Sequence, residues 1–198
     1  MDISTACIHA GYVAGNGEPR ALPITLSTTF RYSSTDEVAR LFDLSESGFF
    51  YSRIGNPTCD AVEKKIAALE GGVGAMLTSS GQAANLLAVI NLASAGDHII
   101  ASSTIYGGTV NLFSVTLKRF GIECTYVSPR ATKEEILAEV RPNTKCVFGE
   151  TVANPALAVL DLEVFAQAAH EAGLPLIIDN TFPTPVLCRP FVWGADIV

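Results

Sequence analysis

The chain has 198 residues, of which 48% are apolar and 17% are charged, and its net charge at pH 7 is −7. This composition is typical of a globular protein with one sizeable core. The acidic balance, and the lack of a lysine- or arginine-rich block, argue against a nucleic-acid surface. No apolar run is long enough to span a membrane, and the first residues, MDISTACIHAGY, do not resemble a secretory signal.

The five cysteines are scattered along the chain and form no CxxC pair. This pattern is typical of reduced thiols in a cytoplasmic protein rather than of a disulfide framework or a zinc site. The histidines His9, His98 and His170 are also dispersed, so we predict no metal site. His98 begins the apolar run HIIAS and is expected to be a core or strand-end residue.

Residues 1–50 contain glycine and proline breaks and one short helical piece, DEVARLFDL. Because such a segment has little core of its own, we predict an arm that packs on a neighbouring subunit. Residues 51–198 are predicted to form a second, larger domain. It opens with a helix in which Asn56 is the cap, Pro57 lies in the first turn and Gly71 ends the last turn.

After Gly71, short apolar strands alternate with helices. Strands are predicted at GAMLT, HIIAS, IECTYVS, KCVFGE and PLIIDN, with GADIV starting another, and helices at GQAANLLAVINLAS, GGTVNLFSVTLKRFG, TKEEILAEV and DLEVFAQAAHEAG. The first of these helices is apolar on nearly all sides and is expected to be buried. The alternation predicts an α/β fold, with a mainly parallel sheet flanked by helices on both faces and ligands bound at the carboxyl ends of the strands.

The first predicted strand end with candidate ligand-binding residues is GAMLTSSGQAAN. A Ser-Ser-Gly turn leads into a helix near Gly81, and free N–H groups at a helix start favour a phosphate. Ser79 or Ser80 could add a hydroxyl group. The motif is neither GxGxxG nor a Walker A sequence, which disfavours a dinucleotide or ATP. The alternative is a plain serine cap followed by a glycine turn.

The second strand end is PLIIDNTF, where Asp179 follows four apolar residues. A carboxylate in such a place needs a partner, which could be a metal, an arginine or a protonated ring nitrogen. Alternatively, Asp179 caps the next turn. The third is STIYGGT, where Tyr106 could stack on a flat ring or simply pack beneath a loop. Together, a phosphate seat, a stacking ring and a carboxylate for a ring nitrogen describe a pyridoxal phosphate pocket.

A fourth motif, YSRIGNPT, places Tyr51 and Arg53 just before the helix that begins at Pro57. The guanidinium fork of Arg53 and the hydroxyl of Tyr51 suit the oxygens of an anion. The alternative is that Arg53 pairs locally with Asp60 or Glu63 on the helix surface.

These motifs resemble the Cys/Met-metabolism family of pyridoxal-phosphate enzymes, and the resemblance runs from IHAGY through LPITLSTTF, YSRIGNPT, SSGQAA, YGGT, ETVANP and IIDNTF to GADIV. It implies an aminotransferase-like type I fold and a cytoplasmic homotetramer of tight dimers with shared active sites, which binds neither nucleic acid nor membrane. It also implies residue roles. Tyr51 and Arg53 would bind the cofactor phosphate of the neighbouring subunit, and Gly81 and Gln82 that of their own subunit. Tyr106 would stack on the ring and assist the leaving group, Asn154 would lie near the phenolic oxygen, and Asp179 would pair with the pyridinium nitrogen.

The family's Schiff-base lysine follows GADIV by about ten residues, in a Ser-x-Thr-Lys context, and none of Lys64, Lys65, Lys118, Lys133 and Lys145 matches that context. The expectation is a fold truncated before its lysine and its C-terminal domain, which should be inactive as a 198-residue chain.

Within the family, SGQAA, LPI and the segment around YSRIGNPT are most similar to O-acetylhomoserine sulfhydrylases. Methionine γ-lyases typically have a cysteine where this chain has Gly108. The resemblance thus implies γ-replacement at O-acetylhomoserine by sulfide or methanethiol, a step of methionine biosynthesis and transsulfuration. The alternatives are methionine γ-lyase, cystathionine γ-synthase, a non-catalytic α/β binding or assembly module and, more remotely, a nucleotide-binding oxidoreductase.

Overall fold

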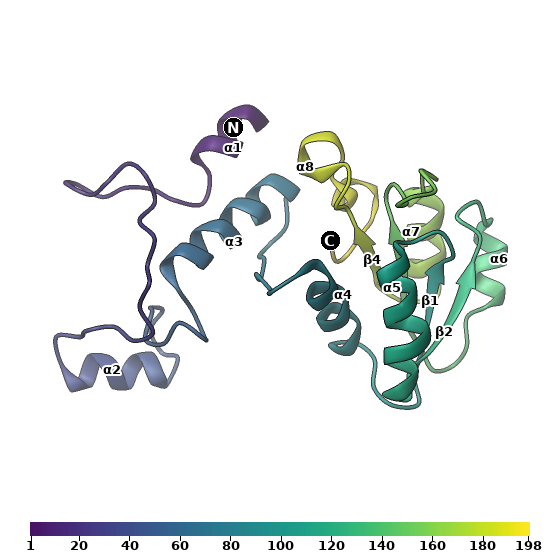
Figure 1. Cartoon of the computed structure of the whole chain (residues 1–198), viewed down its shortest axis with the longest axis horizontal. Helices are drawn as coiled ribbons and strands as arrows, with labels where there is room; N and C mark the ends of the chain where they lie inside the picture. Colours follow the sequence, from purple (N-terminus) through teal and green to yellow (C-terminus); the bar gives the residue numbers. More distant parts are fainter. The chain divides into compact units, whose positions relative to one another are not determined.

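The computed structural model describes all 198 residues, which form two compact units, residues 1–77 and residues 78–198 (Figure 1). The first unit contains three helices, α1 (Ile3–His9), α2 (Thr35–Phe42) and α3 (Pro57–Glu70). The second unit holds the sheet and the remaining helices. The predicted boundary at residue 50, between an arm and a cofactor-binding domain, stays a prediction.

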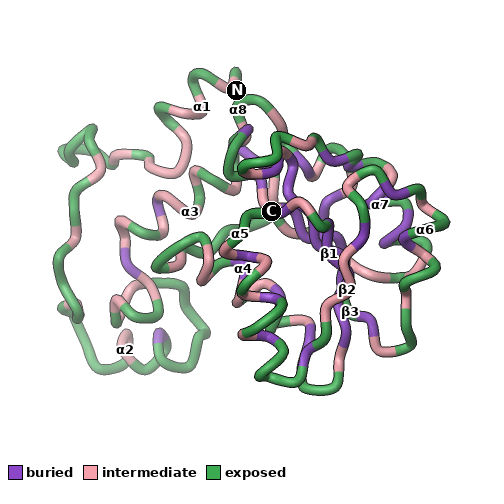
Figure 2. The backbone as a smooth tube through the Cα atoms, turned by 45° about the vertical axis from the view of Figure 1, so that its right-hand side comes forward, coloured by how far each residue is buried: buried purple, intermediate pink, exposed green.

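Helix α3 forms as its end signals predict. The side chain of Asn56 accepts a hydrogen bond from the N–H group of Thr58, Pro57 occupies the first turn, and Gly71 follows the last. Helix α1 was not predicted. Its cap is Asp2, whose carboxylate accepts a hydrogen bond from the N–H group of Ser4. Helix α1 lies along α3, and Lys65 of α3 donates hydrogen bonds to two backbone carbonyl oxygens of α1. Within residues 1–50 only Leu41 is buried, as Figure 2 shows by the scarcity of purple there.

The second unit is built on the predicted parallel sheet. Its strands are β1 (His98–Ser102), β2 (Glu123–Val127), β3 (Thr144–Glu150) and β4 (Leu176–Asp179), in the order β2-β1-β3-β4, and all neighbours run parallel. The helices are α4 (Gly81–Ile90), α5 (Gly107–Asn111), which continues as the π-helical η1 (Leu112–Leu117), α6 (Lys133–Ala138), α7 (Leu162–Glu171), α8 (Thr184–Leu187) and the 3₁₀ turn η2 (Pro190–Trp193).

Helices cover both faces of this sheet, as predicted. Successive strand residues point to opposite faces, so the apolar strands present side chains on both faces that must be covered. On one face, Ile100 packs with Phe165 of α7 and with residues of α6. On the other face, Ile99 packs with Phe113 of η1, whose ring meets that of Phe148 edge-on at 4.9 Å between centroids.

His98 lies in the core at the start of β1, as predicted, and is fully buried. Its two ring nitrogens lie 2.8 Å from the hydroxyl oxygens of Thr144 and Thr125. Burial lowers the pKa of His98, and the positive charge of Arg141 lowers it further. The imidazole is therefore a neutral link between β1 and its two neighbouring strands.

Two sequence-based expectations are wrong in the structure. The segment GAMLT forms no strand, because no strand hydrogen bonds to it, and Met76 is 70% exposed. Helix α4 is only partly buried, because Asn85 and Val89 are its only buried residues while Ile90 is 40% exposed. In the segment GADIV, which was predicted to start another strand, Ile197 forms an isolated parallel bridge with Ile177 of β4. None of the helices has the length and the apolar composition that a membrane span requires.

Candidate functional site

The second unit brings several predicted site residues to one edge of the sheet. Asp179 is the last residue of β4, Tyr106 follows β1, and Asn154 follows β3. Gly81 and Gln82 form the first turn of α4. Since the strands are parallel, their carboxyl ends share one edge, which is where ligands bind in sheets of this kind.

The start of α4 can hold an anion. The hydroxyl of Ser80 accepts a hydrogen bond from the N–H group of Ala83 at 3.1 Å, so the serine cap that was considered as the alternative does form. The cap leaves the N–H groups of Gly81 and Gln82 without a partner in the protein. A Cβ atom added at Gly81 would meet nothing within 4 Å, so the space beside the Cα atom of this residue is open. Free N–H groups and the positive end of a ten-residue helix suit a phosphate.

Asp179 is held by neutral donors. One carboxylate oxygen accepts from the N–H group of Thr181 at 3.0 Å and from its hydroxyl, so Asp179 also caps the next turn. The other oxygen accepts from the side-chain amide of Asn85 at 3.3 Å. None of the ion pairs of the chain involves Asp179. The carboxylate is thus oriented while its negative charge stays available to a cationic ligand atom.

A small hydrogen-bond network that sequence reasoning missed connects α4, α5 and β4. Asn85 is buried one turn after Gly81, and it donates to Asp179 and to the hydroxyl of Thr109 at 3.2 Å. The amide of Gln82 donates to the same hydroxyl at 2.9 Å. The available signal was Asn85 itself, a polar side chain within an apolar helix, because such a side chain needs hydrogen-bond partners when it is buried.

Tyr106 lies at the start of α5 and is 45% exposed, so part of its ring is free to stack on a flat ligand. Its backbone N–H group donates to a carboxylate oxygen of Glu150 at 2.6 Å. The ring lies against Gly108, where an added Cβ atom would come within 2.5 Å of it. The ring position therefore depends on the absence of a side chain at residue 108.

Asn154 lies in the turn that follows β3 and is partly buried. Its peptide bond to Pro155 is cis. Burial raises the pKa of the nearby Glu150 carboxyl group, and the backbone N–H group of Asn154 lies close enough to that group to oppose part of the rise. Asn154 therefore lies at the same strand ends as Tyr106 and Asp179.

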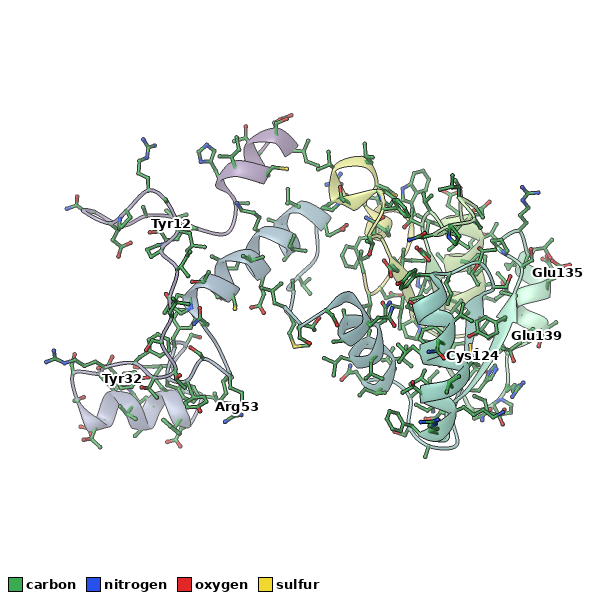
Figure 3. The ribbon with its side chains drawn as sticks, in the orientation of Figure 1. Tyr12, Tyr32, Arg53, Cys124, Glu135 and Glu139 are labelled. Carbon is green, nitrogen blue, oxygen red and sulfur yellow. The ribbon has the colours of Figure 1, made fainter.

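Tyr51 and Arg53 lie in the first unit. Tyr51 pairs with Thr29 in an antiparallel bridge, and the guanidinium carbon of Arg53 lies 5.2 Å from the centroid of the Tyr51 ring. Arg53 makes no ion pair, since Asp60 pairs with Lys64 at 2.6 Å and Glu63 accepts from the N–H group of Leu77 at 2.7 Å. The alternative of a local ion pair is therefore wrong. Figure 3 shows the exposed side chain of Arg53 projecting from its loop.

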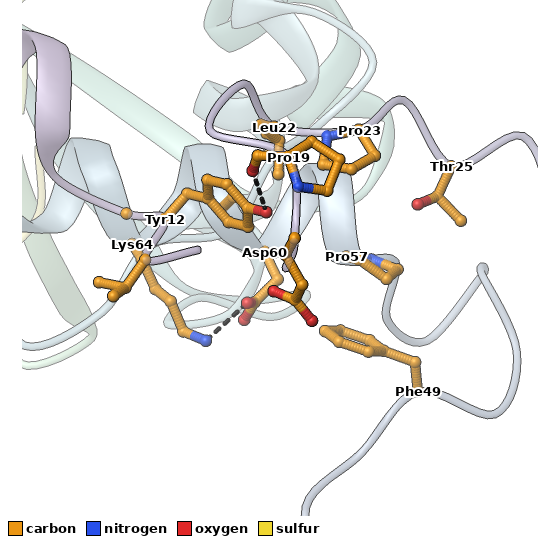
Figure 4. Close-up of a pocket in the computed structure, with 13 residues that line it drawn as sticks. Tyr12, Pro19, Leu22, Pro23, Thr25, Phe49, Pro57, Asp60 and Lys64 are labelled. Carbon is orange, nitrogen blue, oxygen red and sulfur yellow. Dashed lines mark hydrogen bonds and ion pairs between the residues drawn. The ribbon is translucent and has the colours of Figure 1, made fainter. Parts of the chain in front are cut away.

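The first unit also contains a cavity of about 440 Å³ between the chain around residues 11–25 and α3 (Figure 4). In its wall, the hydroxyl of Tyr12 donates to the carbonyl of Pro19 at 2.9 Å, and Lys64 pairs with Asp60. Neither Tyr51 nor Arg53 lines it. The cavity is therefore separate from the residues predicted to bind a cofactor phosphate.

The residues of the second unit fit pyridoxal phosphate. The start of α4 offers N–H groups to a phosphate, the ring of Tyr106 offers a face to a flat heterocycle, and the carboxylate of Asp179 can keep a pyridine nitrogen protonated. Tyrosine and arginine side chains that suit a phosphate lie in the first unit.

Comparisons with known proteins agree with this chemistry. The chain is 49% identical to the O-acetyl-L-homoserine sulfhydrylase of Corynebacterium glutamicum, covering 98% of this chain and 45% of that protein, and 47% identical to O-acetyl-L-homoserine sulfhydrylase 1 of Thermus thermophilus, covering 100% and 48%. It is 41% identical to the L-methionine gamma-lyase of Porphyromonas gingivalis, covering 98% and 49%. The chain thus spans about half the length of these relatives.

A solved structure of an O-acetylhomoserine (thiol)-lyase from Campylobacter jejuni superposes with a TM-score of 0.94 at 37% identity, over 99% of this chain and 48% of that chain. That protein carries an N'-pyridoxyl-lysine-5'-monophosphate. The likeness confirms the predicted type I fold. The model for the family of Cys/Met metabolism PLP-dependent enzymes matches residues 4–198. The chain therefore belongs to the family of Cys/Met metabolism PLP-dependent enzymes.

Proposed function

We propose that the protein catalyses γ-replacement at O-acetyl-L-homoserine. The C–O bond at the γ carbon breaks, acetate leaves, and sulfide or methanethiol forms a C–S bond at that carbon, giving homocysteine or methionine. The observation that carries the proposal is the cluster of Asp179, Tyr106 and the start of α4 in one unit. It stands in a chain that is 49% and 47% identical to two O-acetyl-L-homoserine sulfhydrylases. Bound pyridoxal phosphate supplies the electron sink for such chemistry.

The residues of this chain would bind and orient the cofactor. We assign the N–H groups of Gly81 and Gln82 to the phosphate, and the ring of Tyr106 to stacking and to assisting the leaving group. Asp179, oriented by Asn85, would hold the proton on the pyridine nitrogen. Asn154 would lie near the phenolic oxygen. Because this set provides no side-chain cation, we assign the remaining phosphate contacts to Tyr51 and Arg53 of a neighbouring copy.

We also propose a homotetramer of tight dimers with shared active sites, in which residues 1–50 are an arm on the neighbouring subunit and residues 51–198 belong to the cofactor-binding domain. Two observations support the assembly. Only Leu41 is buried within residues 1–50, and Arg53 is exposed with no acidic partner. All five cysteines are free, which suits a reducing compartment, and we propose that the protein works in the cytoplasm.

Gly108 favours the sulfhydrylase assignment over methionine γ-lyase, and two neighbouring glycines allow a matched test. A Cβ atom at Gly108 would collide with the ring of Tyr106, whereas one at Gly107 would meet nothing within 4 Å. In the product of the complete reading frame, we expect Gly108→Ala to lower kcat/KM on the order of tenfold, the value of an aromatic stack, with Gly107→Ala close to the wild type. Equal effects of the two substitutions on steady-state kinetics would contradict the proposed ring position.

The proposed reaction is tested with the product of the complete reading frame, loaded with pyridoxal phosphate. We expect homocysteine from O-acetylhomoserine plus sulfide, and no 2-oxobutanoate from methionine, both measured by mass spectrometry. Release of 2-oxobutanoate from methionine would instead favour methionine γ-lyase. A protein that binds the cofactor but forms neither product would favour a non-catalytic module.

A further inference from the structure

Glu150 is a buried acid at the centre of the candidate site that none of the assigned roles uses. It is the last residue of β3 and only 6% exposed. In the register of β3 and β4 it lies directly opposite Asp179. A carboxyl group in such a place is costly unless it is hydrogen bonded, so its partners indicate what it does.

The main partner of Glu150 is the loop that carries Tyr106. A carboxylate oxygen of Glu150 accepts from the backbone N–H group of Tyr106 at 2.6 Å, a short contact typical of charge-assisted hydrogen bonds. No side chain caps α5 at Tyr106, and Glu150 is the only side chain that hydrogen bonds to this residue. The contact therefore fixes the start of α5 against the end of β3.

The surroundings of Glu150 connect three residues assigned to the cofactor. Burial raises the pKa of its carboxyl group, and the charge of Asp179 raises it too, while the N–H groups of Tyr106 and Asn154 act in the opposite direction. Asp179 is itself oriented by hydrogen bonds from Asn85 and Thr181. Glu150 thus lies between the residue assigned to stack on the ring and the residue assigned to its nitrogen.

We propose that Glu150 is a positioning residue, which holds the ring of Tyr106 in register with the cofactor ring that Asp179 binds. It acts through the backbone of Tyr106 and touches neither substrate nor cofactor. The inference rests on the proposed function, because it takes the cofactor roles of Tyr106 and Asp179 as given. It adds a residue that the sequence motifs did not single out.

The test uses variants of the product of the complete reading frame, loaded with pyridoxal phosphate. In Glu150→Ala we expect a weaker visible circular dichroism band of the cofactor, because this band reports the orientation of the cofactor ring. We also expect kcat to fall on the order of tenfold. In Glu150→Gln, whose side-chain oxygen can still accept from Tyr106, we expect most of the band and of kcat to return. In a Tyr106→Ala background, Glu150→Ala should add no further loss, since both changes act on one ring.

Losses that multiply in the double variant, or a Glu150→Ala variant with an unchanged band and kcat, would overturn the proposal. If Glu150→Ala fails to fold in thermal unfolding, Glu150→Gln and Glu150→Met carry the same comparison, because methionine has similar length but no such acceptor. The circular dichroism band is measured without substrate. A wild type that shows the band but forms no homocysteine therefore rejects the proposed reaction and leaves the positioning role to be judged on the band alone.

Discussion

Asp179→Asn is expected to lower kcat of the product of the complete reading frame on the order of 10²–10³-fold, the usual cost of removing one preorganised electrostatic partner. The asparagine side chain nearly matches the aspartate in shape, so Asn85 and Thr181 keep a partner at residue 179. It carries no negative charge, however, and cannot hold a proton on the pyridine nitrogen. The measurement is steady-state kinetics with O-acetylhomoserine and sulfide at saturating cofactor.

Asp161→Asn is the matched control for this change. Asp161 caps α7 through its side chain, at the N–H group of Val164, and asparagine caps helices equally well. We expect this variant to keep the wild-type kcat. A kcat that falls equally in both variants, or that survives in Asp179→Asn, would mean that the Asp179 carboxylate has no electronic role.

Arg53→Ala is expected to weaken retention of pyridoxal phosphate by about 10- to 150-fold, from the value of about 1.5–3 kcal/mol for hydrogen bonds to charged groups. Arg53 is exposed and makes no ion pair, so its removal should leave the fold of its unit unchanged. We expect Arg53→Lys to restore part of the affinity, because lysine keeps the charge but not the planar fork. Equilibrium dialysis against pyridoxal phosphate gives the affinity.

Arg20→Ala removes an exposed arginine from the same unit and serves as the control. It should not change cofactor affinity, and both alanine variants should unfold at the wild-type temperature. If Arg53→Ala binds the cofactor as tightly as Arg20→Ala, the assignment of YSRIGNPT to a phosphate is wrong.

Local signals predicted much of the fold. The cap at Asn56 and the break at Gly71 bound α3 as expected, and apolar runs such as HIIAS and PLIIDN became the parallel strands β1 and β4. The failures concern properties that depend on distant partners. GAMLT has the composition of a strand, but no strand pairs with it, and the apolar surface of α4 is only partly covered.

In the candidate site, too, residues marked by local sequence signals were predicted, and residues that depend on distant partners were missed. The motifs indicated Gly81, Tyr106 and Asp179 because each stands at a strand end or a helix start. Asn85 and Glu150 escaped notice because their partners are far away in sequence, 94 residues for Asn85 to Asp179 and 44 residues for Glu150 to Tyr106. Such contacts depend on sheet order and register, which no local pattern contains.

A crystal structure of the product of the complete reading frame with pyridoxal phosphate tests the cofactor site most directly. We predict the ring nitrogen at hydrogen-bond distance from the carboxylate of Asp179, the ring beneath Tyr106, and the phosphate on the N–H groups of Gly81 and Gln82 and on Arg53 of a neighbouring copy. A cofactor whose phosphate lies away from the start of α4, or whose ring nitrogen faces away from Asp179, would contradict the account.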